Sequence, residues 1–231
     1  MVKSWRMLGQ AVVVAAVAFA GWGSGVAAAQ SACADLGGTV GADQVCHVRV
    51  AESTYVYEIA FPSDYPDQQP VTDYLRQERD SFVDFVTTRP SRSDLPYELD
   101  AKGATYQPGS PQPGTTSLVF RVYSETGGAH PIHYFKTFNY DLSRGVPITF
   151  DTLFTPGAAS LDVIYRAVVS RLKKRVPEEE MYGGHDVKTY QDFAITDDAV
   201  IFFFDQGEVL SQVAGPIEIP VPRSELASIL A

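Results

Sequence analysis

A chain of 231 residues with aromatic side chains throughout is long enough to bury one hydrophobic core. Its 28 acidic residues against 18 basic ones give a net charge of −10, which disfavours partners that need clustered lysine and arginine. Nucleic acids and anionic lipid surfaces are partners of that kind, so we predict that this protein binds no nucleic acid.

The first 29 residues have the pattern of an export signal. Lys3 and Arg6 give a basic start, residues 11–20 form an apolar run, and an A-x-A cleavage site ends the segment. Glycines interrupt the apolar run, so a retained spanning helix, which needs about 20 predominantly apolar residues, is the less favoured alternative. We predict a signal peptide over residues 1–29 and a single secreted domain over residues 30–231, with no stable membrane anchor after cleavage.

Cys33 and Cys46 are the two cysteines of the chain. In an exported protein such a pair is expected to form a disulfide. Closing a loop of this size would stabilise the fold by about 3 kcal/mol and would fix the N-terminal segment. Two sulfurs alone do not fill a tetrahedral zinc shell, so we predict no cysteine-based metal site.

Strand-like and helix-like patterns follow one another in the first half of the chain. Residues 46–50 and 55–61 are rich in β-branched and aromatic side chains and indicate paired strands. Apolar residues then recur at three- and four-residue spacing, which predicts an amphipathic helix from Pro70 to about Thr87 with an apolar stripe against a sheet. Residues 97–107 indicate another strand, and a surface loop rich in proline and glycine follows.

Two glycines mark a reversal of the chain in its middle. Residues 117–125 and 132–142 are strand-like, and residues 126–131 between them contain Gly127 and Gly128. Glycine supplies the positive φ that a tight reversal needs. We therefore predict a hairpin between these two strands.

The C-terminal third combines a helix with short strands. We predict a short strand over residues 148–154, and a helix that begins at Ser160 as N-cap and ends before Pro177. The remaining strand-like runs cover residues 193–196, 199–205 and 217–222. Residues 200–204 are continuously apolar, which is typical of a strand buried on both faces, whereas the prolines of the last run favour an edge. Together these elements predict an α+β fold, with two main helices packed on a mostly antiparallel mixed sheet.

His130 and His133 lie within the predicted hairpin, where a metal site has to be considered. Side chains three positions apart on a strand point to opposite faces, so the two rings would not converge on one ion without a bulge. The helical two-histidine zinc motif needs a spacing of four. The sequence also contains neither a phosphate-binding loop nor a dinucleotide fingerprint, so we predict no metal and no cofactor.

An exported hydrolase is the enzyme class that we tested against the sequence. The mature chain contains no Gly-x-Ser-x-Gly motif of the esterase type. One register of the hairpin places Ser124 across from His133, which would put a hydroxyl beside an imidazole. The same register sets Arg121 across from Lys136, which is unfavourable. The candidate catalytic residues are therefore Ser124, His133 and His130, as hypotheses that depend on this register.

Several segments together carry a resemblance to a known family. They are YPDQQPVTDYL (65–75), LPYELD (95–100), GGAHP (127–131), TFNYDL (137–142), ITFDTLF (148–154), YQDFAITDDAVIFFF (190–204), GE (207–208) and AGPIEIPVPRS (214–224). In combination they resemble the secreted immunogenic proteins of mycobacteria, whose C-terminal region, here about residues 115–231, is shared with the lysozyme-sensing anti-sigma factor RsiV. The resemblance implies a secreted antigen with a mixed α and β fold, in a group whose members have been classed as esterases.

Two functional hypotheses follow from the residues and the resemblance. The first is a secreted carboxylesterase that acts on short-chain acyl esters. The alternative is a non-catalytic extracellular binding module or antigen that recognises a host or cell-wall protein. Gly207 and Val213 stand where the RsiV-type pattern usually has tyrosines, and this departure favours the antigen branch over lysozyme binding. The expected partner is a small ester substrate or an extracellular protein, and we predict a monomer.

Overall fold

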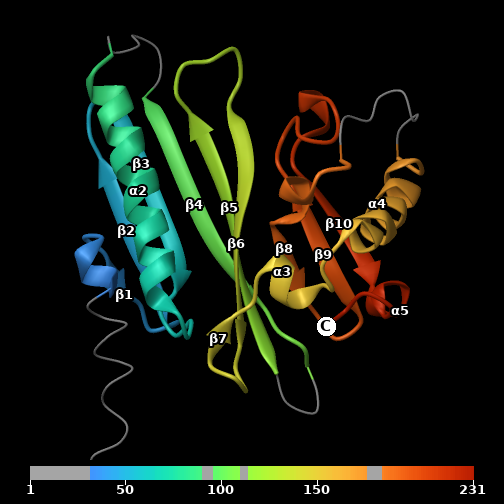
Figure 1. Ribbon diagram of the computed structural model, residues 1–231. Helices are drawn as coiled ribbons and strands as arrows, with labels where there is room; N and C mark the ends of the chain where they lie inside the picture. Colours follow the sequence, from blue (N-terminus) through green and yellow to red (C-terminus); the bar gives the residue numbers. More distant parts are fainter. Residues whose placement is uncertain (1–31, 90–95, 110–113, 176–183) are drawn as a thin grey trace, which may run out of the picture.

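The computed structural model describes residues 32–89, 96–109, 114–175 and 184–231 (Figure 1). The predicted signal peptide, residues 1–29, lies outside these ranges. None of the helices within the described ranges has both the length and the apolar character needed to cross a membrane.

The larger of two sheets has seven strands in chain order (Figure 1). They are β1 (Thr39–Val40), β2 (Val45–Ala51), β3 (Tyr55–Pro62), β4 (Tyr97–Tyr106), β5 (Thr115–Glu125), β6 (Ile132–Asp141) and β7 (Val146–Pro147). All neighbouring pairs are antiparallel except β3 and β4, which are parallel. Parallel neighbours need a crossover connection, and α2 (Gln68–Thr87) provides it.

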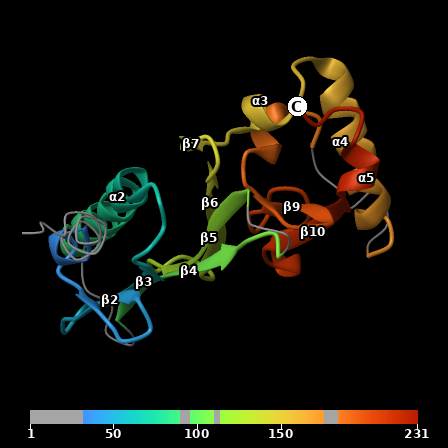
Figure 2. The same cartoon turned by 90° about the horizontal axis from the view of Figure 1, so that it is seen from below.

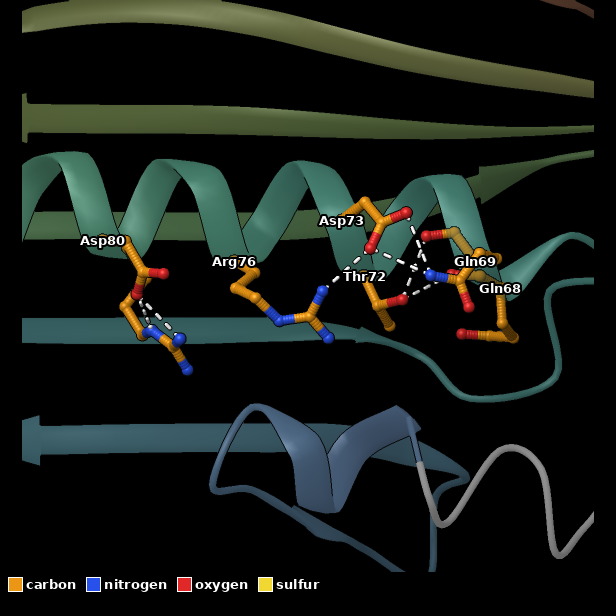
Figure 3. A network of polar contacts seen from close by, with 7 residues as sticks. Gln68, Gln69, Thr72, Asp73, Arg76 and Asp80 are labelled. Carbon is orange, nitrogen blue, oxygen red and sulfur yellow. Dashed lines mark hydrogen bonds and ion pairs between the residues drawn. The ribbon is translucent and has the colours of Figure 1, made fainter.

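Helix α2 covers one face of the large sheet, as the predicted apolar stripe requires. Its buried side chains include Val71, Leu75 and Phe82, which join a core with residues of β3 and β5. The outer side of the helix is polar: the Asp73 carboxylate accepts hydrogen bonds from Gln69 at 2.9 Å and from Arg76 at 2.8 Å (Figure 3). Pairs of this kind on a helix surface contribute only about 0.2–0.5 kcal/mol each. We interpret this network as a solvated helix face.

The predicted disulfide is present in the N-terminal part of the large sheet. The sulfur atoms of Cys33 and Cys46 lie 2.02 Å apart, and both residues are buried. The bond fixes the segment before β1 to strand β2.

A second sheet of three strands forms the C-terminal lobe. Its order is β10 (Ile217–Pro222), β9 (Ala199–Phe204) and β8 (Phe193–Ile195), so the apolar run is central and the proline-containing strand is an edge, as predicted. Helix α4 (Ala158–Leu172) packs on this sheet, and its Ile164 and Val168 belong to the same buried cluster as Phe202 and Phe204 of β9. Shorter helices complete the lobe: α3 (Phe150–Leu153), α5 (Arg223–Leu226), η2 (Val187–Tyr190) and η3 (Gln212–Ala214).

The two lobes are joined through the face of the large sheet that α2 does not cover (Figure 2). The backbone N–H of Phe193 in β8 donates to Thr137 Oγ1 at 3.1 Å, and that of Ile195 donates to Ser117 Oγ at 3.0 Å. The rings of Phe135 and Phe203 pack between the sheets, with centroids 5.0 Å apart. The predicted α+β class is thus confirmed, and each main helix covers a sheet of its own.

The predicted strand over residues 148–154 is wrong. The chain forms β7 and then turns into α3, because Thr149 and Thr152 cap the helix start reciprocally: Thr149 N donates to Thr152 Oγ1 at 2.8 Å. Phe154 makes only an isolated bridge to Leu230.

The predicted start of the following helix is also wrong. Gly157, with φ +122°, is the N-cap of α4, and Ser160 lies inside the first turn. The Ser160 hydroxyl donates to the carbonyl of Thr155, outside the helix. Helix α4 ends at Leu172, and Pro177 lies outside the described residues.

Candidate functional site

The hairpin between β5 and β6 is present, but its register differs from the predicted one by one residue. Tyr123 pairs with His133, and Ser124 pairs with Ile132. This register avoids the unfavourable pairing of Arg121 with Lys136, because Arg121 now lies opposite Phe135. The Arg121 guanidinium carbon lies 5.4 Å from the centre of the Phe135 ring, which makes the contact favourable.

The observed register separates the predicted nucleophile from the predicted base. Directly opposite residues of an antiparallel pair share a face, and successive residues alternate between faces. Ser124 is buried on the side of the sheet that α2 covers, together with Phe120 and Val122, whereas His133 lies on the other side with Tyr123. The expected contact between the Ser124 hydroxyl and the His133 imidazole is therefore not formed.

Both histidines of the hairpin nevertheless line one cavity of about 490 Å³. Its walls are formed by His130, Pro131, His133, Gln206, Gln212, Val213, Gly215 and Pro216. The two histidines can line one cavity because His130 lies in the connection before β6 and does not follow strand alternation, whereas their failure to converge on one metal ion stays a prediction. Among the described residues, no group of three or more histidine, cysteine, aspartate or glutamate side chains could hold a metal ion.

The contacts of the two rings give them different roles. Nδ1 of His130 lies 3.1 Å from the Pro131 carbonyl oxygen, which can only accept a hydrogen bond. The proton of the neutral imidazole is therefore on Nδ1, and Nε2 carries the lone pair. The ring of His133 packs at 59° against that of Tyr123, with centroids 5.1 Å apart, which restricts its orientation.

The opposite wall of the cavity comes from the turn after β9. The Gln206 N–H donates to the His133 carbonyl, and Gln206 Oε1 accepts from the His133 N–H, both at 3.0 Å. Gly207 has φ +87°, and a Cβ there would lie 2.8 Å from Gln212 Cγ. Glycine at this position therefore permits the close approach of Gln212. Val213, in η3, is 95% exposed at the rim.

Two acidic side chains accept hydrogen bonds from backbone N–H groups on the edge of strand β6. Asp205 Oδ1 accepts from the Phe135 N–H and Asp192 Oδ1 accepts from the Thr137 N–H, each at 2.7 Å. Buried N–H groups on an edge strand have no neighbouring strand to accept their hydrogen bonds, so they need acceptors of this kind. Sequence reasoning missed Asp192, Asp205 and Gln206. The only sequence signal for these residues was an acidic residue, Asp205, directly after the apolar run 200–204.

The carboxyl groups of this edge have raised pKa values. Burial is the main cause for Asp192 and Asp205, and the charge of Lys136 opposes it in both. Burial also raises the pKa of Glu208 from 4.5 to about 7, against a hydrogen bond from the Asp205 N–H. The folded state therefore holds these protons more tightly than the unfolded chain does.

The pKa of Glu208 predicts a pH dependence of stability. Its contribution is fully present below pH 4.5 and is lost as the pH rises through about 7, so the free energy of unfolding should fall across this window. Glu208 is an exposed residue, so water screens much of the effect and the change in slope should be small. Urea unfolding of Glu208→Gln from pH 4.5 to 7 should show a shallower decline than the wild type.

Glu225→Gln is the control for this experiment. A hydrogen bond from Arg171 lowers the pKa of Glu225, so its contribution has the opposite sign and lies at lower pH. The control should therefore keep the wild-type slope. An unchanged slope in Glu208→Gln would contradict the prediction.

The other two histidines lie outside this cavity. His47 lies 3.3 Å from an Asp43 carboxylate oxygen, and His185 lies 2.8 Å from one of Asp162. In the described part of the chain, the hydrogen bonds of histidine rings go to these carboxylates and to the Pro131 carbonyl, and none involves a serine or threonine hydroxyl.

Comparison with known proteins gives strong matches over almost the whole chain. The protein is 43% identical to "Esterase Rv3036c" of Mycobacterium tuberculosis, over 96% of this chain and 97% of that one. It is 38% identical to "Immunogenic protein MPT64" of the same species and to "Immunogenic protein MPB64" of Mycobacterium bovis, over 95% of this chain and 97% of each. The chain belongs to the MPT64 family. The resemblance seen in the sequence is thereby confirmed.

A second match covers the part of this MPT64-type chain that forms one wall of the cavity. The family "Protein of unknown function (DUF3298)" matches residues 151–224. These residues supply the Gln206 wall, whereas His130 and His133 come from the hairpin before them. The cavity is thus built across the boundary of the DUF3298 match.

Solved structures support the fold. A DUF3298-family protein from Pseudomonas aeruginosa superposes with a TM-score of 0.57 at 14% identity, over 81% of this chain and 94% of that one. One from Bacteroides fragilis gives a TM-score of 0.53 at 14% identity, over 81% and 93%. At this identity the likeness shows the α+β fold alone.

Proposed function

We propose that this protein is a secreted hydrolase of short-chain acyl esters that acts in the cavity beside His130 and His133. The observation that carries the proposal is the 43% identity, over nearly the full length, to a relative named as an esterase. The Cys33–Cys46 disulfide and the membership in a family of immunogenic proteins support an extracellular location.

The cavity offers the groups that ester hydrolysis needs. In its neutral form, His130 carries the lone pair on Nε2, which suits a general base. The carboxamide of Gln206 can donate a hydrogen bond to a carbonyl oxygen. Val213 and the neighbouring prolines provide apolar contact for a short acyl chain.

These groups support hydrolysis by a water molecule without an acyl-enzyme. His130 Nε2 accepts a proton from water as the water oxygen bonds to the ester carbonyl carbon. The bond between that carbon and the alcohol oxygen then breaks, and the imidazolium returns the proton to the departing alkoxide. The products are a carboxylic acid and an alcohol. Ser124 has no part in this route, because it lies on the other face of the sheet.

The test is hydrolysis of 4-nitrophenyl acetate and butyrate by the purified mature protein. We expect His130→Gln to lower kcat/KM by about 100-fold or more, the usual effect of removing a general base, and His133→Gln to lower it by less. His47→Gln, His185→Gln and Ser124→Ala should remain close to the wild type. Equal activity in all five variants would reject the cavity as the site and would point to a contaminating esterase.

A non-catalytic binding module is the second candidate. It is favoured by the separation of Ser124 from His133 and by the 95% exposure of Val213 at the rim of the cavity. In this case the partner would be an extracellular protein, and the mature protein would show no ester hydrolysis above the buffer rate. Loss of partner binding in Val213→Asp, with an unchanged fold, would identify the contact surface.

A further inference from the structure

The side chain of Gln206 is the most firmly held polar group of the cavity wall. Its Oε1 accepts from the His133 backbone N–H at 3.0 Å, and the backbone N–H of Gln206 donates to the His133 carbonyl at 3.0 Å. On the preceding residue, Asp205 Oδ1 accepts from the Phe135 N–H at 2.7 Å. The turn is therefore hydrogen-bonded to two successive outward-facing N–H groups of strand β6.

This bonding leaves one end of the carboxamide for the cavity. An N–H can be accepted only by oxygen, so the bond from His133 assigns Oε1 to the strand. The side-chain NH₂ of Gln206, a residue that lines the cavity, is the end that remains as a donor. Because the backbone of β6 fixes the oxygen, the donor is held in place before any substrate binds.

Gln212 is the other carboxamide in the cavity wall, and it differs in this respect. It lies on η3, with its side chain against Gly207. None of the hydrogen bonds found in the described ranges holds its side chain. Gln206, which is fixed, is therefore distinguished from Gln212, which is not.

We propose that Gln206 donates its side-chain NH₂ to the oxyanion that forms when water attacks an ester in this cavity. The inference rests on the proposed esterase function. As the water oxygen bonds to the carbonyl carbon, the electron pair of the C=O π bond moves to oxygen. The Gln206 donor stabilises this charge. The pair returns when the bond to the alcohol oxygen breaks and the alkoxide takes the proton from the His130 imidazolium.

The decisive variant is Gln206→Glu, because glutamate keeps an oxygen for the His133 N–H and removes the donor. We expect kcat for 4-nitrophenyl acetate to fall about 100-fold or more, the usual effect of removing one oxyanion donor, with little change in KM. Gln212→Glu introduces the same charge in the same cavity and should retain kcat within a few-fold. The melting temperatures of both variants should stay close to that of the wild type.

The possible outcomes separate this inference from the proposed function. Wild-type hydrolysis that depends on His130 but is unchanged in Gln206→Glu would overturn the role of Gln206 and leave the esterase function in place. Equal losses in Gln206→Glu and Gln212→Glu would also overturn it, because they would indicate a general effect of charge. A wild type that hydrolyses no ester would overturn both proposals.

Discussion

Phe203→Ala is expected to lower the free energy of unfolding by about 3–5 kcal/mol, the usual cost of removing a buried phenylalanine ring. Phe203 is 2% exposed, and its ring lies between the two sheets. The centroid lies 5.0 Å from that of Phe135 and 5.9 Å from that of Tyr106. The substitution leaves a cavity at the junction of the lobes, which packing on either side can fill only in part. Urea unfolding followed by circular dichroism measures the loss.

Two further variants serve as controls for the Phe203→Ala experiment. Phe203→Leu keeps most of the apolar volume and should lose clearly less stability than Phe203→Ala. Val213→Ala removes methyl groups from a side chain that is 95% exposed and should change the free energy of unfolding by less than about 0.5 kcal/mol. A loss below about 1 kcal/mol in Phe203→Ala would mean that the lobes are held together by other contacts, such as the hydrogen bonds from β8.

Replacing both cysteines by alanine is expected to cost about 3 kcal/mol, because it restores the chain entropy that the cross-link removes from the unfolded state. Cys33 and Cys46 are 13 positions apart, and the bond between them fixes the segment before β1 to the large sheet. The melting temperature of the double variant should fall accordingly, and the N-terminal residues should become more sensitive to protease.

Reduction provides the control for the cysteine experiment. Dithiothreitol should lower the melting temperature of the wild type toward that of the double variant and should have no effect on the double variant. A double variant as stable as the oxidised wild type would contradict the prediction. Ester hydrolysis should survive in the folded double variant, because the disulfide lies in the core cluster of the α2-covered face and the His130 cavity lies between the hairpin and the second lobe.

The sequence by itself determined the elements whose pattern is local. The three- and four-residue spacing of apolar side chains predicted α2, whose bounds moved only to Gln68–Thr87. The double glycine predicted the connection between β5 and β6, and the count of two cysteines predicted the disulfide. In each case the signal lies within one element or in a single residue pair, so no distant contact was needed to read it.

Only the tertiary structure decided how these elements combine and where the site lies. The hairpin register, shifted by one residue, moved Ser124 away from His133, because strand alternation turns a single step into a change of face. The division into two sheets depends on contacts such as that of Phe193 N with Thr137, which are 56 positions apart. The bond between Gln206 and His133, which builds the cavity wall, spans 73 positions. Local patterns carry no information about partners at such separations, and packing of the folded chain selects them.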